Sequence, residues 1–201
     1  MGDNRTSEYV NSVFEQPWWL DAVAQDKWKE ITVEEDGEII ARWPIVEVNK
    51  CIRMPRLTQT LGFWISEEIL ERDTLYNQRK RITNLLLEQF PGNIDINICL
   101  DSNVNYFLPL FWHHFKIIPH VSYRLEDLTD LDAIYNRFPR IIKNNIQRAS
   151  NKVTIKTIDD IEILLALLDR TFSRQNMKNP WPEDLIRNIY NSSKAHNACK
   201  L

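Results

Sequence analysis

The dipeptide Asp36-Gly37 is the feature that most constrains the fold, because it stands between two strand-like segments rich in β-branched residues. Residues 30–35 alternate polar and apolar side chains, and residues 38–43 continue with isoleucines and a tryptophan. An Asp-Gly pair between two such segments is the strongest short-range signal for a two-residue hairpin turn. We therefore expect a tight antiparallel hairpin, with a bulge or an edge position at Pro44 where the second strand continues.

The elements around this hairpin alternate between helix and strand. The sequence predicts a helix at 15–23, an irregular strand at 52–57, a long helix from Ser66 to about Phe90, a strand at 94–100, a helix at 103–115 and a strand at 116–125. Helices that alternate with strands in this way are typical of the α/β class. We expect residues 1–127 to form one domain, with a mixed, mostly antiparallel sheet flanked by helices.

A second unit is expected to begin at residue 128. The pattern predicts helices from Thr129 to about Phe138, at 140–150, at 159–174 and at 182–193, with a short strand at 153–156. The third of these helices is apolar nearly all round, which is typical of a helix buried on several sides. Since no further sheet follows it, residues 128–201 are expected to be junction helices and the start of an incomplete second α/β unit.

Composition excludes several classes of protein. A hydrophobic fraction of 43% with 26% charged residues is ordinary for a globular protein, and a net charge of −3 gives no overall attraction to nucleic acid or anionic lipid. No signal peptide and no run of about 18 apolar residues are present, so we expect a cytoplasmic protein without a membrane span. The three cysteines are widely spaced and suggest neither a disulfide framework nor a metal site.

A basic segment near the domain junction is the first candidate site. Residues 137–156 carry six cationic side chains and no acidic one, with Lys143 and Arg148 on the predicted helix. Such a helix can hold a phosphate of a nucleotide-linked substrate or of RNA. The alternative is a solvated helix face whose cations serve solubility.

The turn after the third strand is the second candidate. Arg53, Arg56, Gln59 and Thr60 cluster there and could line a polar substrate cleft at the ends of the strands, or form an ordinary exposed loop. No G-x-S-x-G motif and no glycine-rich phosphate loop occur in the chain. The sequence therefore identifies no catalytic residue and predicts no bound metal.

Four segments carry a resemblance to a known family: Ser12–Leu20 (SVFEQPWWL), Arg42-Trp43-Pro44, Met54–Gly62 (MPRLTQTLG) and Lys143–Ala149 (KNNIQRA). In these segments the chain resembles the Fem-like, methicillin-resistance and peptidoglycan-bridge branch of the GNAT N-acyltransferase superfamily. The resemblance implies two GNAT-like domains in tandem, with the substrate cleft mainly on the first and the second incomplete here.

The same resemblance implies a function. Members transfer an acyl or aminoacyl group to an amine, so the donor would be acyl-CoA or aminoacyl-tRNA, and the acceptor a small-molecule amine or a nucleotide-linked cell-envelope precursor. Lys143 and Arg148 match basic residues of the family's junction helix that can bind phosphate, and the turn from Gln59 to Gly62 matches a substrate-facing loop.

Two other functions remain open from the sequence. One is a nucleic-acid-binding module that uses the basic segment 137–156. The other is a catalytically inactive interaction protein that docks the apolar helix at 161–172 on a partner.

Overall fold

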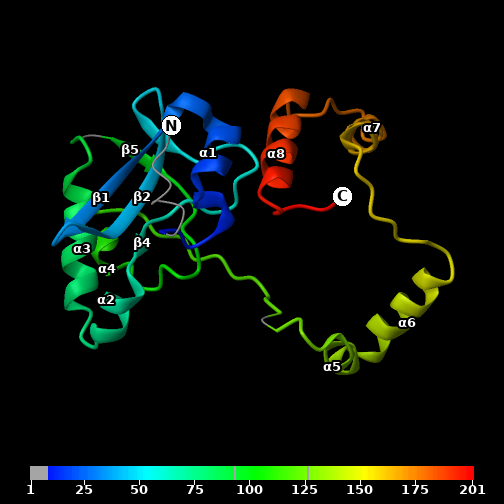
Figure 1. The fold of residues 1–201 in the computed structure, drawn as a ribbon, viewed down its shortest axis with the longest axis horizontal. Helices are drawn as coiled ribbons and strands as arrows, with labels where there is room; N and C mark the ends of the chain where they lie inside the picture. The colour runs from blue at the N-terminus through cyan, green and yellow to red at the C-terminus, as the bar shows by residue number, and fades with distance from the viewer. Residues whose placement is uncertain (1–8, 93, 126) are drawn as a thin grey trace. The chain divides into compact units, whose positions relative to one another are not determined.

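The computed structural model describes residues 9–92, 94–125 and 127–201, and it shows an α/β protein with a mixed five-stranded sheet (Figure 1). The strands are β1 (Trp28–Glu35), β2 (Glu38–Val48), β3 (Cys51–Arg53), β4 (Trp64–Ile65) and β5 (Asp95–Asn97). The helices are α1 (Pro17–Ala24), α2 (Glu67–Arg72), α3 (Asn77–Glu88), α4 (Leu108–Trp112), α5 (Leu131–Arg137), α6 (Arg140–Ser150), α7 (Ile161–Ser173) and α8 (Glu183–Ala195). Short 3-10 turns lie at Val13–Glu15 and Gln25–Lys27.

The chain divides into two compact units. The first runs to Ile117 and also takes in Ile161–Cys199, so it contains the sheet and helices α1 to α4, α7 and α8. The second comprises Ile118–Asp160 with Lys200–Leu201, and it contains α5 and α6. In the described part of the chain, no helix is long and apolar enough to cross a membrane.

The predicted hairpin is confirmed. Glu35 pairs with Glu38 across a two-residue turn in which Asp36 and Gly37 have φ values of 52° and 82°. Both turn residues thus adopt the left-handed region, as a type I′ turn requires. The bulge lies at Val33/Glu34 rather than at Pro44, which stays in register in β2.

Strand β2 is the centre of the sheet. Its neighbours are β1 along one edge, and β4 and β3 at different places on the other edge; β5 then runs parallel to β3. Among the described residues, β4 pairs with Ala41–Arg42 and β3 with Glu47–Val48, so Pro44 lies between these two partners. Because proline cannot donate to a ladder, this interrupted edge explains why β2 tolerates it.

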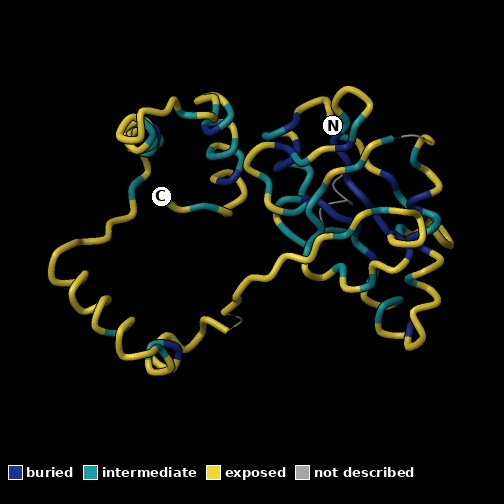
Figure 2. Tube along the Cα trace, turned by 180° about the vertical axis from the view of Figure 1, so that it is seen from behind, coloured by how far each residue is buried: buried dark blue, intermediate teal, exposed yellow. Residues whose placement is uncertain are grey.

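The two faces of the sheet bury separate apolar clusters. Trp43 and Ile45 of β2 pack with Phe63 and with Ile82 and Leu86 of α3. Val46, which points to the other face because side chains alternate along a strand, packs in a cluster with Trp19 and Leu20 of α1 and Leu61. Figure 2 shows this burial along the strands.

Helix α8 packs beside α1 on that second face (Figure 1). The ring of Trp18 stacks on His196, with ring centroids 4.6 Å apart and an interplanar angle of 9°. Ile189 of α8 packs against the Trp19–Leu20 cluster. The C-terminal helix is therefore part of the first unit.

The long helix expected from Ser66 is two helices. Chain direction changes at Tyr76, whose φ is 58°, and the carboxylate of Asp73 accepts hydrogen bonds from the backbone N–H groups of Gln78 (3.1 Å) and Arg79 (2.7 Å). Asp73 thus satisfies the free donors at the start of α3. Leu75, expected on the apolar face, lies in the intervening turn and is 76% exposed.

The chain after α3 is less regular than the sequence predicts. The expected strand 94–100 is reduced to β5, the helix 103–115 to α4, and neither 116–125 nor 153–156 forms a strand. Val121, Tyr123 and Ile155 are almost fully exposed. A segment with alternating apolar residues forms a strand only where a neighbouring strand pairs with its backbone N–H and C=O groups. None of the described strands lies beside these segments.

Two expectations about the later helices are also wrong. Asp130, not Thr129, caps α5 by accepting a hydrogen bond from the backbone N–H of Ala133 at 2.9 Å. Helix α7 is buried on one side only, because Leu165 is buried whereas Ile163 and Leu167 are exposed.

Candidate functional site

The parallel strands β3 and β5 end side by side, and the segments that follow them stay in contact. Arg53 pairs with Asn97 at the last register position, and farther on the backbone N–H of Leu61 donates to the carbonyl of Cys99 at 2.8 Å. In open α/β sheets the region beyond the carboxyl ends of parallel strands is where ligands bind. The residues around this point are therefore the candidate site.

A series of hydrogen-bonded polar side chains occupies this candidate site. The hydroxyl of Thr60 donates to Asp101 Oδ2 at 3.4 Å, and Ser12 Oγ lies 3.2 Å from Thr60 Oγ1. The other carboxylate oxygen, Asp101 Oδ1, accepts the backbone N–H of Asn103 at 2.9 Å. We call Ser12, Thr60 and Asp101 the hydroxyl–carboxylate cluster. All three side chains are partly exposed, so a ligand can reach them.

Beside this cluster lies the fully buried Glu15. Its carboxylate accepts the backbone N–H of Asn11 (2.7 Å) and of Gly62 (3.0 Å), and the side-chain amide of Asn11 (3.0 Å). Burial raises the pKa of Glu15 above its ordinary value of 4.5, hydrogen bonds from Asn11 and Gly62 lower it in part, and the charge of Asp101 raises it slightly. Since Glu15 is inaccessible and its oxygens are occupied, its role is to position the two loops.

Gly62 allows the close approach of these loops. A Cβ atom at this position would lie 3.2 Å from Leu100 Cδ2 and 3.6 Å from the backbone nitrogen of Asp101. A side chain here would require the Leu100 side chain to shift by a few tenths of an ångström. The absence of a side chain at Gly62 thus lets this loop pack closely against Leu100 and Asp101.

Arg42 of β2 holds the segment before α1 in place through hydrogen bonds to its backbone. Its side chain is fully buried; Nε donates to Glu30 at 2.6 Å, and a terminal nitrogen donates to the carbonyls of Glu15 (3.0 Å) and Tyr9 (3.3 Å). The central strand thus holds the segment that carries Ser12 and Glu15. Such a charged group is stable inside a protein only when it is paired and hydrogen-bonded.

The structure separates the four residues that the sequence grouped in the turn after the third strand. Thr60 belongs to the hydroxyl–carboxylate cluster, while Arg53 is exposed and forms an ion pair with Asp95 at 2.9 Å. Arg56 and Gln59 are exposed.

Lys143 and Arg148 lie on α6 in the second unit. Lys143 Nζ donates to the carbonyl of Asn136 at 2.8 Å and lies 5.6 Å from the ring centroid of Tyr135, whereas Arg148 is exposed. Within the described residues, no ion pair involves a cation of the segment 137–156.

Sequence reasoning missed Ser12, Glu15 and Asp101. Asp101 had a usable signal, since it directly follows an apolar strand pattern and so stands at a strand's carboxyl end. Glu15 and Ser12 had none, because the contacts that bring them to the site, with Gly62 and Thr60, are made more than 40 residues away along the chain.

No described residues form a group of three or more His, Cys, Asp or Glu side chains that could hold a metal ion. His113 instead contacts Asn84 Oδ1 at 3.2 Å. Comparison with family models, with curated proteins and with solved structures finds no significant match to this chain.

Proposed function

We propose that this protein is a cytoplasmic, GNAT-like N-acyltransferase. It would move an acyl or aminoacyl group from acyl-CoA or aminoacyl-tRNA to the amine of a small molecule or of a nucleotide-linked cell-envelope precursor. The single observation that carries the proposal is the position of Asp101: an accessible carboxylate, oriented by Thr60 at 3.4 Å, beyond the ends of two parallel strands.

The reaction needs a proton acceptor. When the amine attacks the acyl carbonyl, a C–N bond forms, the C–S or C–O bond to the donor breaks, and the amine nitrogen loses a proton. Asp101 Oδ2 is the acceptor in this proposal, and the Thr60 hydroxyl fixes the direction of its lone pairs. A positioned general base of this kind contributes about 10²–10⁴-fold in rate, and holding the two reactants in place supplies more.

The decisive experiment is a transfer assay. The purified chain is mixed with radiolabelled acetyl-CoA or with charged tRNA, together with a panel of amines that includes nucleotide-linked amino sugars and peptides. Transfer of label to an amine, at a rate above that of the heat-unfolded protein, supports the proposal. Absence of transfer from both donors, with the chain shown to be folded by circular dichroism, would refute it.

A second candidate function rests on a separate observation, the cations of residues 137–156, none of which forms an ion pair with another described residue. This segment would bind the phosphates of an RNA such as tRNA. Affinity for RNA should then fall steeply with salt, and Lys143→Ala with Arg148→Ala should reduce the slope of log K against log[salt] by about 1 for each lost contact. Lys178→Ala, an exposed lysine outside the segment, is the control. A slope that the double variant leaves unchanged rules this function out.

A further inference from the structure

An open pocket lies at the end of α4, in the first unit. Its volume is about 450 Å³, and it is lined by Phe111, Trp112, His114, Phe115 and Lys116, which we call the aromatic pocket. Sites for small organic molecules have volumes of about 300–1,000 Å³ and are lined mainly by apolar and aromatic side chains with a few polar groups. The aromatic pocket has this size and this lining, and it contains no residue of the hydroxyl–carboxylate cluster.

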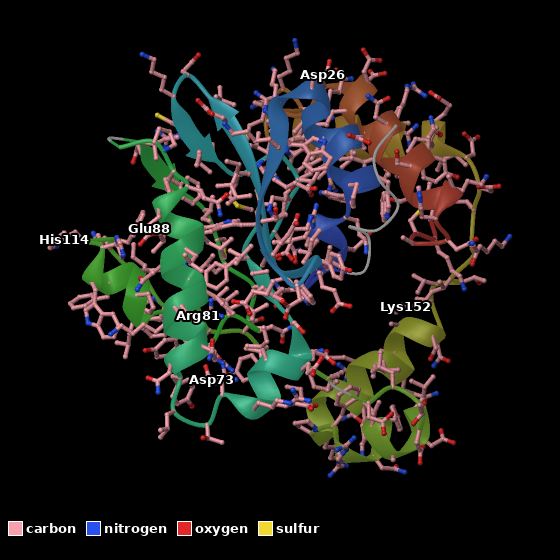
Figure 3. The ribbon with its side chains drawn as sticks, turned by 60° about the vertical axis from the view of Figure 1, so that its left-hand side comes forward. Asp26, Asp73, Arg81, Glu88, His114 and Lys152 are labelled. Carbon is pink, nitrogen blue, oxygen red and sulfur yellow. The ribbon has the colours of Figure 1, made fainter. Side chains whose placement is uncertain are left out.

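The way in which α4 ends gives the pocket its shape. His114, which Figure 3 labels, is exposed and takes the left-handed conformation with a φ of 64°. Its backbone N–H donates to the carbonyl of Phe111, and the N–H of Phe115 donates to the carbonyl of Leu110, both at 3.0 Å. These two hydrogen bonds form a Schellman motif, which reverses the chain at a helix end. The motif therefore returns Phe115 and Lys116 toward the last turn of α4.

Two aromatic rings of the pocket are open to solvent on a helix that is held in place. Phe111 is 63% exposed and Trp112 is 48% exposed. On the side of α3, Lys80 Nζ lies 4.9 Å from the ring centroid of Trp112, and His113 Nε2 lies 3.2 Å from Asn84 Oδ1. Exposed rings that are fixed in this way offer a flat surface on which the ring of a ligand can stack.

The charge around these rings has one sign. Lys116 lines the pocket, no acidic side chain is among its described lining residues, and residues 102–120 contain no Asp or Glu. None of the ion pairs among the described residues includes Lys116 or Lys80. A ligand with a negative charge is therefore complementary to the pocket, whereas a cationic ligand is repelled.

We propose that the aromatic pocket binds a planar aromatic ring that carries an anionic group. The ring stacks on the side chains of Phe111 and Trp112, and the anionic group binds the ammonium group of Lys116. Two kinds of molecule have this chemistry: a mononucleotide, with a base and a phosphate, and an aromatic carboxylic acid. The proposal does not depend on acyl transfer, because occupation of the pocket is measured without any transfer reaction.

The test is equilibrium dialysis of the full chain at constant ionic strength. The probes are two pairs of an anion and its neutral analogue, AMP with adenosine and benzoate with benzamide. At least one anion should bind saturably, and about tenfold more tightly than its neutral analogue, since one hydrogen bond to a charged group is lost in the analogue. Preference for AMP identifies a nucleotide as the ligand, and preference for benzoate identifies an aromatic acid. No saturable binding of either anion, or equal binding within each pair, overturns the proposal.

Variants then locate the binding. Phe111→Ala removes an exposed ring, so the chain should stay folded while affinity for the anion falls about tenfold or more, the effect of losing one stacked ring. Lys116→Gln should abolish the preference for the anion over its neutral analogue. Phe107→Ala is the control, because this half-exposed ring of the same segment does not line the pocket, and it should leave affinity unchanged.

Two results contradict the proposal at this stage. One is an unchanged affinity in Phe111→Ala or an unchanged preference in Lys116→Gln, since the anion then binds elsewhere. The other is binding of the chain to phosphatidylglycerol vesicles that Phe111→Ala abolishes and that neither AMP nor benzoate displaces. The exposed rings would then contact a lipid surface rather than a small aromatic anion.

Discussion

The carboxylate of Glu15 accepts a hydrogen bond from the backbone N–H of Gly62, which lies 47 residues later in the chain, at 3.0 Å. This contact joins the segment before α1 to the loop after β3. Both segments contribute a hydroxyl to the candidate site, Ser12 from the first and Thr60 from the second. The geometry around Asp101 therefore depends on a buried acid that does not itself take part in the chemistry.

Replacement of Glu15 by glutamine should destabilise the protein. One carboxylate oxygen becomes an NH₂ group, which faces the N–H donors of Asn11 or Gly62 and cannot accept from them. We expect a loss of about 1–3 kcal/mol in the free energy of unfolding, measured by urea denaturation near pH 4.5. Glu34→Gln, at an exposed position of β1, should change it by less than about 0.5 kcal/mol.

The free energies of unfolding of the parent and of Glu15→Gln should also depend differently on pH. Burial raises the pKa of Glu15, so the folded state holds this proton more tightly than the unfolded state does. Its contribution to stability is complete below the ordinary value of 4.5 and is lost as the pH rises through the folded pKa. The stability difference between the parent and Glu15→Gln should therefore narrow as the pH rises from 4 to 8. A difference that widens over this range contradicts the assigned direction.

Asp101→Asn should lower the rate of acyl transfer without unfolding the chain. Asparagine keeps the size of the side chain and can still accept from Thr60 or from Asn103, but it cannot take a proton from an amine. We expect kcat to fall by about 10²–10⁴-fold, with a change of less than about 1 kcal/mol in the free energy of unfolding. Asp26→Asn, in the exposed turn labelled in Figure 3, should leave kcat unchanged. A kcat in Asp101→Asn close to that of the parent removes Asp101 as the base.

Arg42→Met should be one of the most destabilising single changes in the first unit. Methionine fills a similar volume but leaves the carbonyls of Glu15 and Tyr9 without the donor that Arg42 supplies. The expected cost is about 2–5 kcal/mol by thermal or urea unfolding. Arg53→Met breaks the exposed ion pair with Asp95 and should cost at most about 1 kcal/mol. Equal costs for the two variants would show that Arg42 is not buried as described.

The parts of this fold that the sequence predicts well are those set by local chemistry. The turn at Asp36-Gly37 needs positive φ at two consecutive positions, and few other dipeptides satisfy that need. The sequence therefore predicts both the hairpin and its position. The short helix α1 likewise begins at Pro17, where a missing N–H has no cost.

The parts of the fold that the sequence predicts poorly depend on contacts with residues far away along the chain. The segment 116–125 has a strand-like pattern, yet no described strand lies beside it, and all of it except Ile117 is exposed. In the candidate site, Thr60 was predicted from its polar surroundings, whereas Ser12 and Glu15 acquire their roles only through contacts made 48 and 47 residues away. Sequence spacing carries no information about such contacts.

Trp18→Ala should loosen α8 while leaving the sheet intact. The Trp18 ring stacks on His196, immediately after α8, and packs against the Trp19–Leu20 cluster, so its removal weakens the attachment of the C-terminal helix to α1. Hydrogen exchange followed by mass spectrometry should show faster exchange in Glu183–Ala195, by about tenfold or more, with little change in β1 and β2. Trp112→Ala, at a half-exposed ring of α4, should leave exchange in α8 as it was. If exchange in α8 were equally slow in both variants, the packing of α8 on α1 would have to rest on contacts other than this stack.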